Sequence, residues 1–298
     1  MKLSHSEYNL KKKSSVNAQD TTKVQNGVLL KFTQNEDWGV ADLCPRTELG
    51  DVSWKIEIEQ RGLLFSRAVE LALEDMLARK NQQSLLKNQP VKNNYLITDF
   101  LRQDLNQEIY RGETLKIKGN SQIDALAEKL NGVTIPLKLR LDFNSVLDSQ
   151  SFEHFLTLLS DESIKRIEYI EDPTLLSDQW KVWNQQVPLA YDFQRAPYNE
   201  NWARHRIVKP TRERVPEGEN TTLTSAMEHP VGLAHGLRLA QSLAKNISGF
   251  LTLDIFEDTP FHSYFDQRGS ELNFSASALR EVGIGMTSAL QCLEWRDL

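Results

Sequence analysis

The sequence predicts an α/β protein built as a modified (β/α)8-type barrel with a small N-terminal α+β domain. From about Asn94 onward, short apolar strand candidates alternate with stretches of helical spacing, and strands separated by helices pair in parallel. Eight such strands imply a closed barrel. Residues 1–92 mix strand-like runs, loops and one helix. We therefore expect an α+β domain at 1–92, a barrel at 93–265, and a tail at 266–298 that packs on the first domain.

The barrel strands are expected within eight segments, which in chain order are NNYLITDF, TLKIKG, LKLRLDFN, RIEYIEDP, VPLAYDFQ, RIVKPTRE, TTLTSAM and GFLTLDIF. Helical stretches lie between most of them, as in IDALAEKLN, FEHFLTLLS and VGLAHGLRLAQSLAKN. In the N-terminal domain, residues 28–32 form a strand-like run. Residues 64–79 repeat apolar side chains at helical spacing, which predicts a helix.

The composition excludes several classes of protein. Hydrophobic residues make up 40% and charged residues 26% of the 298 residues, as in soluble globular proteins. No apolar run approaches the roughly 20 residues that span a bilayer, so no membrane contact is expected. A net charge of −6 argues against nucleic-acid binding. The two cysteines, Cys44 and Cys292, have no CxxC spacing and suit a reducing cytoplasm, where we expect the protein to lie.

Charged side chains gather where the predicted barrel strands end, which is where parallel barrels carry their functional groups. The strand LKLRLDFN places four polar residues on one face by its period of two: Lys138, Arg140, Asp142 and Asn144. The ends of the other strands offer Lys116, Lys118, Glu171, Asp192 and Lys209. Burying so many charges without partners would be very costly. The pattern therefore predicts a bound cation and a small anionic substrate.

Three carboxylates, Asp142, Glu171 and Asp192, lie on three successive predicted strands. Oxygen ligands without His or Cys favour Mg²⁺, with Mn²⁺ as an alternative, over zinc. Lysines flank this row on the second and sixth strands, which lie on opposite sides of the axis of a closed barrel. One lysine can therefore face each side of a carboxylate substrate held at the metal.

The order of these motifs resembles that of the enolase superfamily and, within it, the muconate-lactonizing subgroup. The matching segments are Lys116-Ile-Lys118, Leu139 to Asn144, Ile170-Glu171-Asp172-Pro173, Asp192 and Val208-Lys209-Pro210-Thr211. A further segment, 224–232, resembles the seventh-strand segment of that subgroup that contacts substrate, here through Thr224 and Ser225. Each motif alone is common, and their joint order carries the resemblance.

The resemblance implies that residues 1–92 form a capping domain and that the barrel binds Mg²⁺ through Asp142, Glu171 and Asp192. It implies that Lys118 is the base, and that the positive charge of Lys116 favours its neutral form. Lys209 would stay protonated on the opposite side of the substrate. Arg140 and Asn144 are expected to orient ligands or the substrate carboxylate.

Within the subgroup, Lys209-Pro210-Thr211 resembles the o-succinylbenzoate synthase family of menaquinone biosynthesis. This implies a carbon–oxygen lyase that dehydrates 2-succinyl-6-hydroxy-2,4-cyclohexadiene-1-carboxylate to o-succinylbenzoate. The dipeptide epimerases tend to carry Asp-x-Asp at the eighth strand, where this chain has Leu253-Asp254-Ile255-Phe256. Dipeptide epimerisation or N-acylamino acid racemisation at the same site, and a non-catalytic barrel, remain alternatives, and the oligomeric state stays open.

Three features depart from the family pattern. Asp192 is followed by Phe193-Gln194 instead of Glu-Ser, and Arg212-Glu213-Arg214 replaces a glycine-rich turn. The helical part of the capping domain is abbreviated. The segment around Asp20 resembles, by position, the N-terminal loop that closes over substrate in this family.

Overall fold

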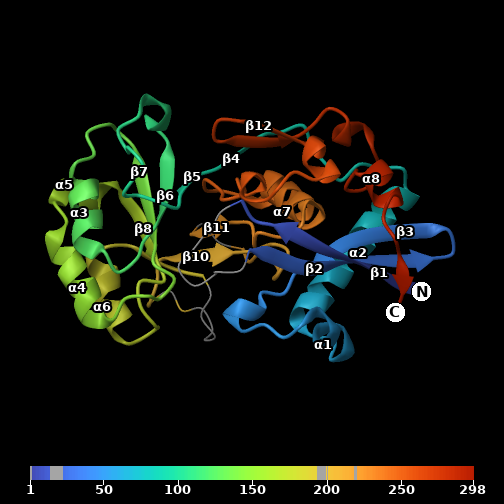
Figure 1. Cartoon of the computed structure of the whole chain (residues 1–298), viewed down its shortest axis with the longest axis horizontal. Coiled ribbons are helices and arrows are strands. Elements are labelled where there is room, and N and C mark those ends of the chain that lie inside the picture. Colours follow the sequence, from blue (N-terminus) through green and yellow to red (C-terminus); the bar gives the residue numbers. More distant parts are fainter. Residues whose placement is uncertain (1, 14–22, 193–198, 200, 218–219) are drawn as a thin grey trace.

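The computed structural model describes residues 2–13, 23–192, 199, 201–217 and 220–298. Asp20 and Phe193-Gln194 lie outside these described residues. Figure 1 shows a parallel sheet with α3 to α6 on its outer side, and an antiparallel sheet that lies beside α2 at the other end of the molecule. The strands β10 and β11 lie between these two parts (Figure 1).

The strands are β1 (Lys2–Lys11), β2 (Val24–Gln34), β3 (Asp37–Leu43), β4 (Val91–Lys92), β5 (Tyr95–Ile97), β6 (Thr114–Lys118), β7 (Lys138–Asp142), β8 (Ile167–Glu171), β9 (Leu189–Tyr191), β10 (His205–Val208), β11 (Thr221–Leu223), β12 (Phe265–Arg268), β13 (Glu271–Phe274) and β14 (Arg296–Asp297). The α-helices are α1 (Trp54–Glu59), α2 (Leu63–Lys80), α3 (Ile123–Asn131), α4 (Ser149–Leu158), α5 (Asp161–Arg166), α6 (Gln179–Gln186), α7 (Pro230–Leu243) and α8 (Thr287–Gln291). In the described residues no helix is both long and apolar enough to cross a membrane.

The barrel sheet has the strand order β11-β10-β9-β8-β7-β6-β5, and every neighbouring pair is parallel. Its outward face is apolar because of the period of two along each strand. Leu139 and Leu141 of β7 are fully buried and share an apolar cluster with Phe152 and Phe155 of α4. The charged residues of the same strand therefore point away from these helices. The fold is a mixed α/β barrel that is curled but incomplete, as the sequence predicted in outline.

The prediction of an eighth barrel strand in GFLTLDIF is wrong, because this segment forms no extended strand. The Gly249 amide donates to the Leu223 carbonyl of β11 at 2.9 Å. The Ser248 amide donates to the Lys92 carbonyl of β4 at 2.9 Å. The next amide, of Phe250, donates to the side chain of Asn93 at 2.8 Å. The ladder therefore stops after two residues, and residues 253–255 turn into a short 3₁₀ helix.

The N-terminal sheet has the order β14-β1-β2-β3 and is antiparallel. Helix α2 packs on it, with Ala68 and Leu71 against Val28 and Leu30 in one buried cluster. Gly39 of β3 makes the close approach possible, because a Cβ there would collide with the backbone of α2. This predicted helix is confirmed by α2.

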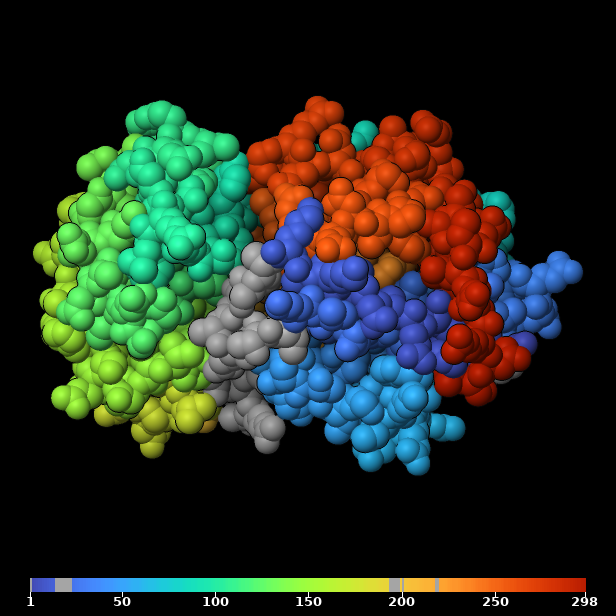
Figure 2. Space-filling view, viewed as in Figure 1, coloured from blue at the N-terminus to red at the C-terminus, as the bar shows by residue number. Residues whose placement is uncertain are grey.

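The C-terminal segment returns to the N-terminal sheet. Strands β12 and β13 form a hairpin that pairs with β4, and β14 pairs with β1 through Ser4 opposite Asp297. Figure 2 shows the last residues, in red, lying against the N-terminal strands, in blue. The domain limits at residues 92 and 265 remain a prediction.

Candidate active site

The predicted catalytic and metal-binding residues meet where the barrel strands end. Lys116 and Lys118 lie on β6, Asp142 ends β7, Glu171 ends β8, Asp192 follows β9, and Lys209 follows β10. The strand register sets Lys118 beside Asp142, and Asp142 beside Glu171. The parallel sheet thus places a row of carboxylates between two lysine-bearing strands.

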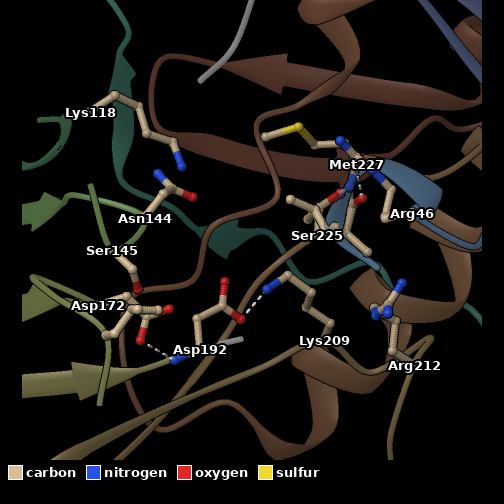
Figure 3. A pocket seen from close by; sticks show the side chains of 13 residues that line it. Arg46, Lys118, Asn144, Ser145, Asp172, Asp192, Lys209, Arg212, Ser225 and Met227 are labelled. Atoms are coloured by element: carbon tan, nitrogen blue, oxygen red, sulfur yellow. Dashed lines mark hydrogen bonds and ion pairs between the residues drawn. The ribbon is translucent and has the colours of Figure 1, made fainter. Parts of the chain in front are cut away.

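Each carboxylate of this row is paired with a lysine. The Lys116 ammonium lies 2.7 Å from Glu171 Oε2 and 2.8 Å from Asp142 Oδ2. The Lys118 ammonium donates to the same Asp142 oxygen at 2.5 Å. Lys209 pairs with Asp192, as the dashed line in Figure 3 marks. Asp142 and Glu171 are each 1% exposed, so these ion pairs are well shielded from water.

The buried charges shift the pKa values of the row in opposite directions. Burial alone would raise the pKa of Asp142, but Lys116 and Lys118 outweigh it and hold that pKa below its usual value. Burial, and then the charge of Asp142, raise the pKa of Glu171 well above its usual value. Burial would lower the pKa of Lys116, yet Asp142 and Glu171 raise it well above its usual value. Asp142 is therefore favoured as a carboxylate and Lys116 as an ammonium, whereas burial disfavours the charged form of Glu171.

This donor set fits a hard divalent cation by its chemistry. Asp142, Glu171 and Asp192 offer carboxylate oxygens, the ligands that Mg²⁺ and Mn²⁺ take. Across the described residues, however, no three Asp, Glu, His or Cys side chains are arranged to hold a metal ion. The Lys116 ammonium lies between Asp142 and Glu171, at 2.8 and 2.7 Å from their carboxylate oxygens. Metal binding would require that ammonium to move.

A cavity of about 230 Å³ lies beside Lys118, Asp192 and Lys209 (Figure 3). Its lining residues are Arg46, Leu49, Lys118, Asn144, Ser145, Asp172, Leu175, Asp192, Lys209, Arg212, Ser225, Ala226 and Met227. A second cavity of about 80 Å³ shares Lys118, Asp192 and Lys209 with it and adds Lys116, Asp142 and Thr224. The two lysines proposed to flank a substrate thus line both spaces.

The other predicted contacts lie at different depths. Asn144 and Ser225 line the larger cavity and Thr224 the smaller one. Arg140 is fully buried one layer deeper, where its guanidinium donates to Glu168 at 2.8 Å and to the Asn94 side chain at 3.1 Å. The structure thus brings every predicted residue except Arg140 to the cavities or to the carboxylate row beside them.

Two arginines at the far end of the larger cavity were not predicted as site residues. Arg46, in the loop after β3, is 4% exposed, pairs with Glu48 and donates to the Ala226 carbonyl at 3.1 Å. Arg212, in the loop after β10, makes two hydrogen bonds to Asp51 at 2.8 and 2.9 Å. Arg212 could have been flagged, since it replaces an expected glycine-rich turn. Arg46 comes from a segment with no strand-end signal.

Asp172 is a further cavity residue, to which the sequence analysis assigned no role. It lines the cavity, and its Oδ1 accepts a hydrogen bond from the backbone of Asp192 at 3.3 Å. It also has a positive φ of 40°, a conformation that is uncommon outside glycine and Asn/Asp. Its place in the Glu171-Asp172-Pro173 motif was the available signal.

Comparison with known proteins identifies relatives of this chain. Residues 3–78 match the family described as O-succinylbenzoate synthase, N-terminal domain. A protein of Bdellovibrio bacteriovorus named o-succinylbenzoate synthase is 27% identical over 334 residues, covering 100% of this chain and 99% of its own length.

Solved structures show the same fold. A dipeptide epimerase from Cytophaga hutchinsonii, complexed with Mg and the dipeptide D-Ala-L-Val, superposes with a TM-score of 0.74 at 15% identity, covering 100% of this chain and 99% of that one. An o-succinylbenzoate synthase from Thermosynechococcus elongatus, with Mg in its active site, gives a TM-score of 0.66 at 16% identity over 87% of this chain and 95% of that one. The resemblance to o-succinylbenzoate synthases that the motifs indicated is confirmed, and this chain shares its fold with these solved structures.

Proposed function

We propose that this chain, which resembles the o-succinylbenzoate synthases and has the fold of the enolase superfamily, is a metal-dependent carbon–oxygen lyase. Its substrate would be 2-succinyl-6-hydroxy-2,4-cyclohexadiene-1-carboxylate and its product o-succinylbenzoate, an intermediate of menaquinone biosynthesis. One observation supports this most: four basic side chains line the larger cavity, Lys118 and Lys209 from the ends of barrel strands and Arg46 and Arg212 from loops.

The charge of the cavity suits a substrate with two carboxylates. Its lining contains four basic side chains, Lys118, Lys209, Arg46 and Arg212, and two acidic ones, Asp172 and Asp192. The proposed substrate carries one carboxylate on its ring and one at the end of its succinyl chain. The ring carboxylate would lie at the carboxylate row and the succinyl carboxylate toward the arginines, which bind carboxylates through paired N–H donors.

The lining of the cavities is less suited to a dipeptide. Its ammonium needs an acidic partner away from the metal-binding end. At the eighth barrel position Leu251 and Thr252 line the smaller cavity, and the nearby Asp254 is exposed on a 3₁₀ helix outside the lining of both cavities. This observation favours the dehydration over epimerisation, although both reactions begin with removal of a proton next to a carbonyl group.

In the proposed reaction Lys118 acts as the base and removes the proton from the ring carbon that bears the carboxylate. The electron pair of that C–H bond forms the new double bond of the ring and the bond to the hydroxyl group breaks. The hydroxyl group takes up the proton held by Lys118 and leaves as water. The ring becomes aromatic. Lys209, on the other side of the carboxylate row, would remain an ammonium and stabilise the electron-rich ring by its charge.

A divalent cation held by Asp142, Glu171 and Asp192 would supply positive charge against the second negative charge that develops on the ring carboxylate. The ion pairs among the chain's own residues bear on the same step. Lys118 can act as a base only after losing a proton, and its Nζ lies 2.5 Å from Asp142 Oδ2. A cation at Asp142 would release Lys118 from this contact, while Lys116 would keep a positive charge beside it.

The proposal is tested by measuring turnover of the cyclohexadiene substrate through its ultraviolet absorbance, with and without Mg²⁺. We expect turnover that depends on Mg²⁺ or Mn²⁺ and stops on chelation. Epimerisation of L-Ala-L-Glu, measured in deuterated water on the same preparation, is the comparison. Rapid epimerisation without dehydration would replace the proposed lyase with an epimerase, and loss of both activities at saturating metal would favour a non-catalytic barrel.

A further inference from the structure

A second pocket lies on the N-terminal sheet, at the opposite end of β3 from Arg46. It has a volume of about 210 Å³ and is lined by Lys31 of β2, Trp38 of β3, Leu290 and Gln291 of α8, and Trp295. Lys31 and Trp38 are diagonal neighbours on one face of the sheet, since Lys31 pairs with Val40 and Trp38 with Thr33. The C-terminal segment supplies the facing wall.

The ammonium of Lys31 is held by aromatic rings and not by an acid. Its Nζ lies 4.9 Å from the centre of the Trp38 ring and 5.4 Å from that of Trp295, within the range of cation–π contact. Among the residues that the structure describes, no carboxylate forms an ion pair with Lys31. The positive charge therefore faces the pocket without an opposing charge from the described chain.

Both aromatic walls are fixed in place. The indole N–H of Trp295 donates to the Leu290 carbonyl at 3.2 Å, which ties the ring to α8. Trp38 stacks on the guanidinium of Arg79 at 4.0 Å, and Arg79 is itself anchored to Asp75 at 2.9 Å. A ligand entering here would meet a site that needs little rearrangement.

We propose that this pocket is a binding site for a small planar carboxylate, an aromatic acid of about the size of benzoate. The carboxylate would pair with the Lys31 ammonium and the ring would stack against Trp295 or Trp38. The volume suits one substituted ring, because a cavity of about 150 Å³ already accepts benzene. Aromatic rings prefer offset or edge-on contacts with one another, which tryptophan faces provide.

The test is a titration of the full chain with sodium benzoate, followed through the indole N–H resonances by ¹⁵N NMR. Trp38→Phe and Trp295→Phe assign the two resonances of the pocket. We expect both to shift saturably with benzoate, and the dissociation constant to rise at least roughly tenfold in Lys31→Gln, equivalent to about 1.4 kcal/mol. Lys31→Arg, which keeps the charge, should bind closer to the parent.

The matched control is Lys55→Gln, because Lys55 also lies over one tryptophan, Trp54, at 5.2 Å but not in this pocket. Its benzoate affinity at Trp38 and Trp295 should equal that of the parent. Benzamide, which has the ring without the charge, should bind at least roughly tenfold more weakly than benzoate. Equal binding of benzamide, an unchanged affinity in Lys31→Gln, or no shift at the two indoles would each overturn the proposal.

Discussion

At the scale of single residues, two lysines of the same chemistry are set apart by where their strands end. Lys118 shares Asp142 with Lys116, whereas Lys209 pairs with Asp192. The sequence could predict both positions because a strand's period of two fixes which residues face the barrel. It could not predict the ion pairs, since these depend on which neighbouring strand each carboxylate faces.

We predict that substitutions of the two lysines fail in different ways. Lys118→Ala should lower kcat at least about a hundredfold with little change in substrate binding, because general base catalysis typically contributes 10²–10⁴. Lys209→Arg keeps a positive charge and should retain partial activity, while Lys209→Ala should lose more. The measurement is solvent-deuterium incorporation into bound substrate in each variant. Exchange that persists in Lys118→Ala and vanishes in Lys209→Ala would assign the base to the opposite strand.

A second residue-scale prediction concerns His229, which is buried at the start of α7 between Tyr8 and Phe261, with ring centres 4.7 and 4.6 Å away. Burial, and then the charge of His262, lower its pKa from 6.5 to about 3. Between pH 6.5 and about 3, His229 is therefore protonated in the unfolded chain but neutral in the folded chain. The contribution of His229 to stability is complete above pH 6.5 and falls by about 1.4 kcal/mol per pH unit as the pH drops toward 3.

His229→Asn is the matching variant, because asparagine can still accept the Val231 amide as a helix cap. It should be less stable than the parent at pH 7, since the ring packing is lost, and the difference should shrink steadily below pH 6.5. Urea unfolding from pH 7 to 4 measures it. A difference that stays constant with pH would mean that His229 does not titrate as described.

At the scale of elements, strands with strong alternation of apolar and polar residues were predicted most reliably, and segments with weak alternation least reliably. Strand β7 was predicted because apolar Leu139 and Leu141 alternate with polar residues, and the structure keeps that pattern. The segment after Ser248 has similar apolar content but no strand. There the side chain of Asn93 takes the Phe250 amide that a backbone partner would otherwise take. Such a side-chain contact has no signature in periodicity.

We predict that the contact between α2 and β3 depends on the absence of a side chain at Gly39. Gly39→Ala would force a Cβ against the backbone of Ala72 and Met76, which cannot rotate away, so stability should fall by roughly 1–3 kcal/mol or more. Gly132→Ala is the control, since its Cβ would have only ordinary contacts at 3.5 Å or beyond. Urea unfolding should show a loss in the first variant and at most a small change in the second.

At the scale of the whole molecule, the cavity depends on residues that are far apart in sequence. Arg46 reaches it from the loop after β3, and Arg212 from the loop after β10. The two arginines line the same cavity because the N-terminal sheet lies against the barrel. No local sequence pattern predicts this arrangement. The sequence therefore predicted the strand-end half of the candidate site and missed the half that the N-terminal loop contributes.

We predict that the bond between Asp51 and Arg212 shapes substrate binding. Asp51→Asn keeps an acceptor for the Arg46 amide but removes the charge that fixes Arg212. For the proposed substrate KM should rise several-fold, up to about tenfold, with kcat changed little, because contacts remote from the reacting atoms act on both states alike. Glu108→Gln, which loosens the exposed Arg111 outside the lining of the cavity, is the control and should leave KM unchanged. An unchanged KM in Asp51→Asn would show that this contact does not shape the cavity.

The pairing of β1 with β14 has a consequence for synthesis on the ribosome. Strand β1 emerges long before its partner strand, because Arg296 and Asp297, which pair with His5 and Ser4 on its outer edge, emerge about 285 residues after Lys11. At the usual rates of elongation that edge stays open for on the order of half a minute. An uncovered edge invites pairing with other nascent chains. The charges of Lys2, Glu7 and Lys11 along β1 would discourage such pairing until the last residues arrive.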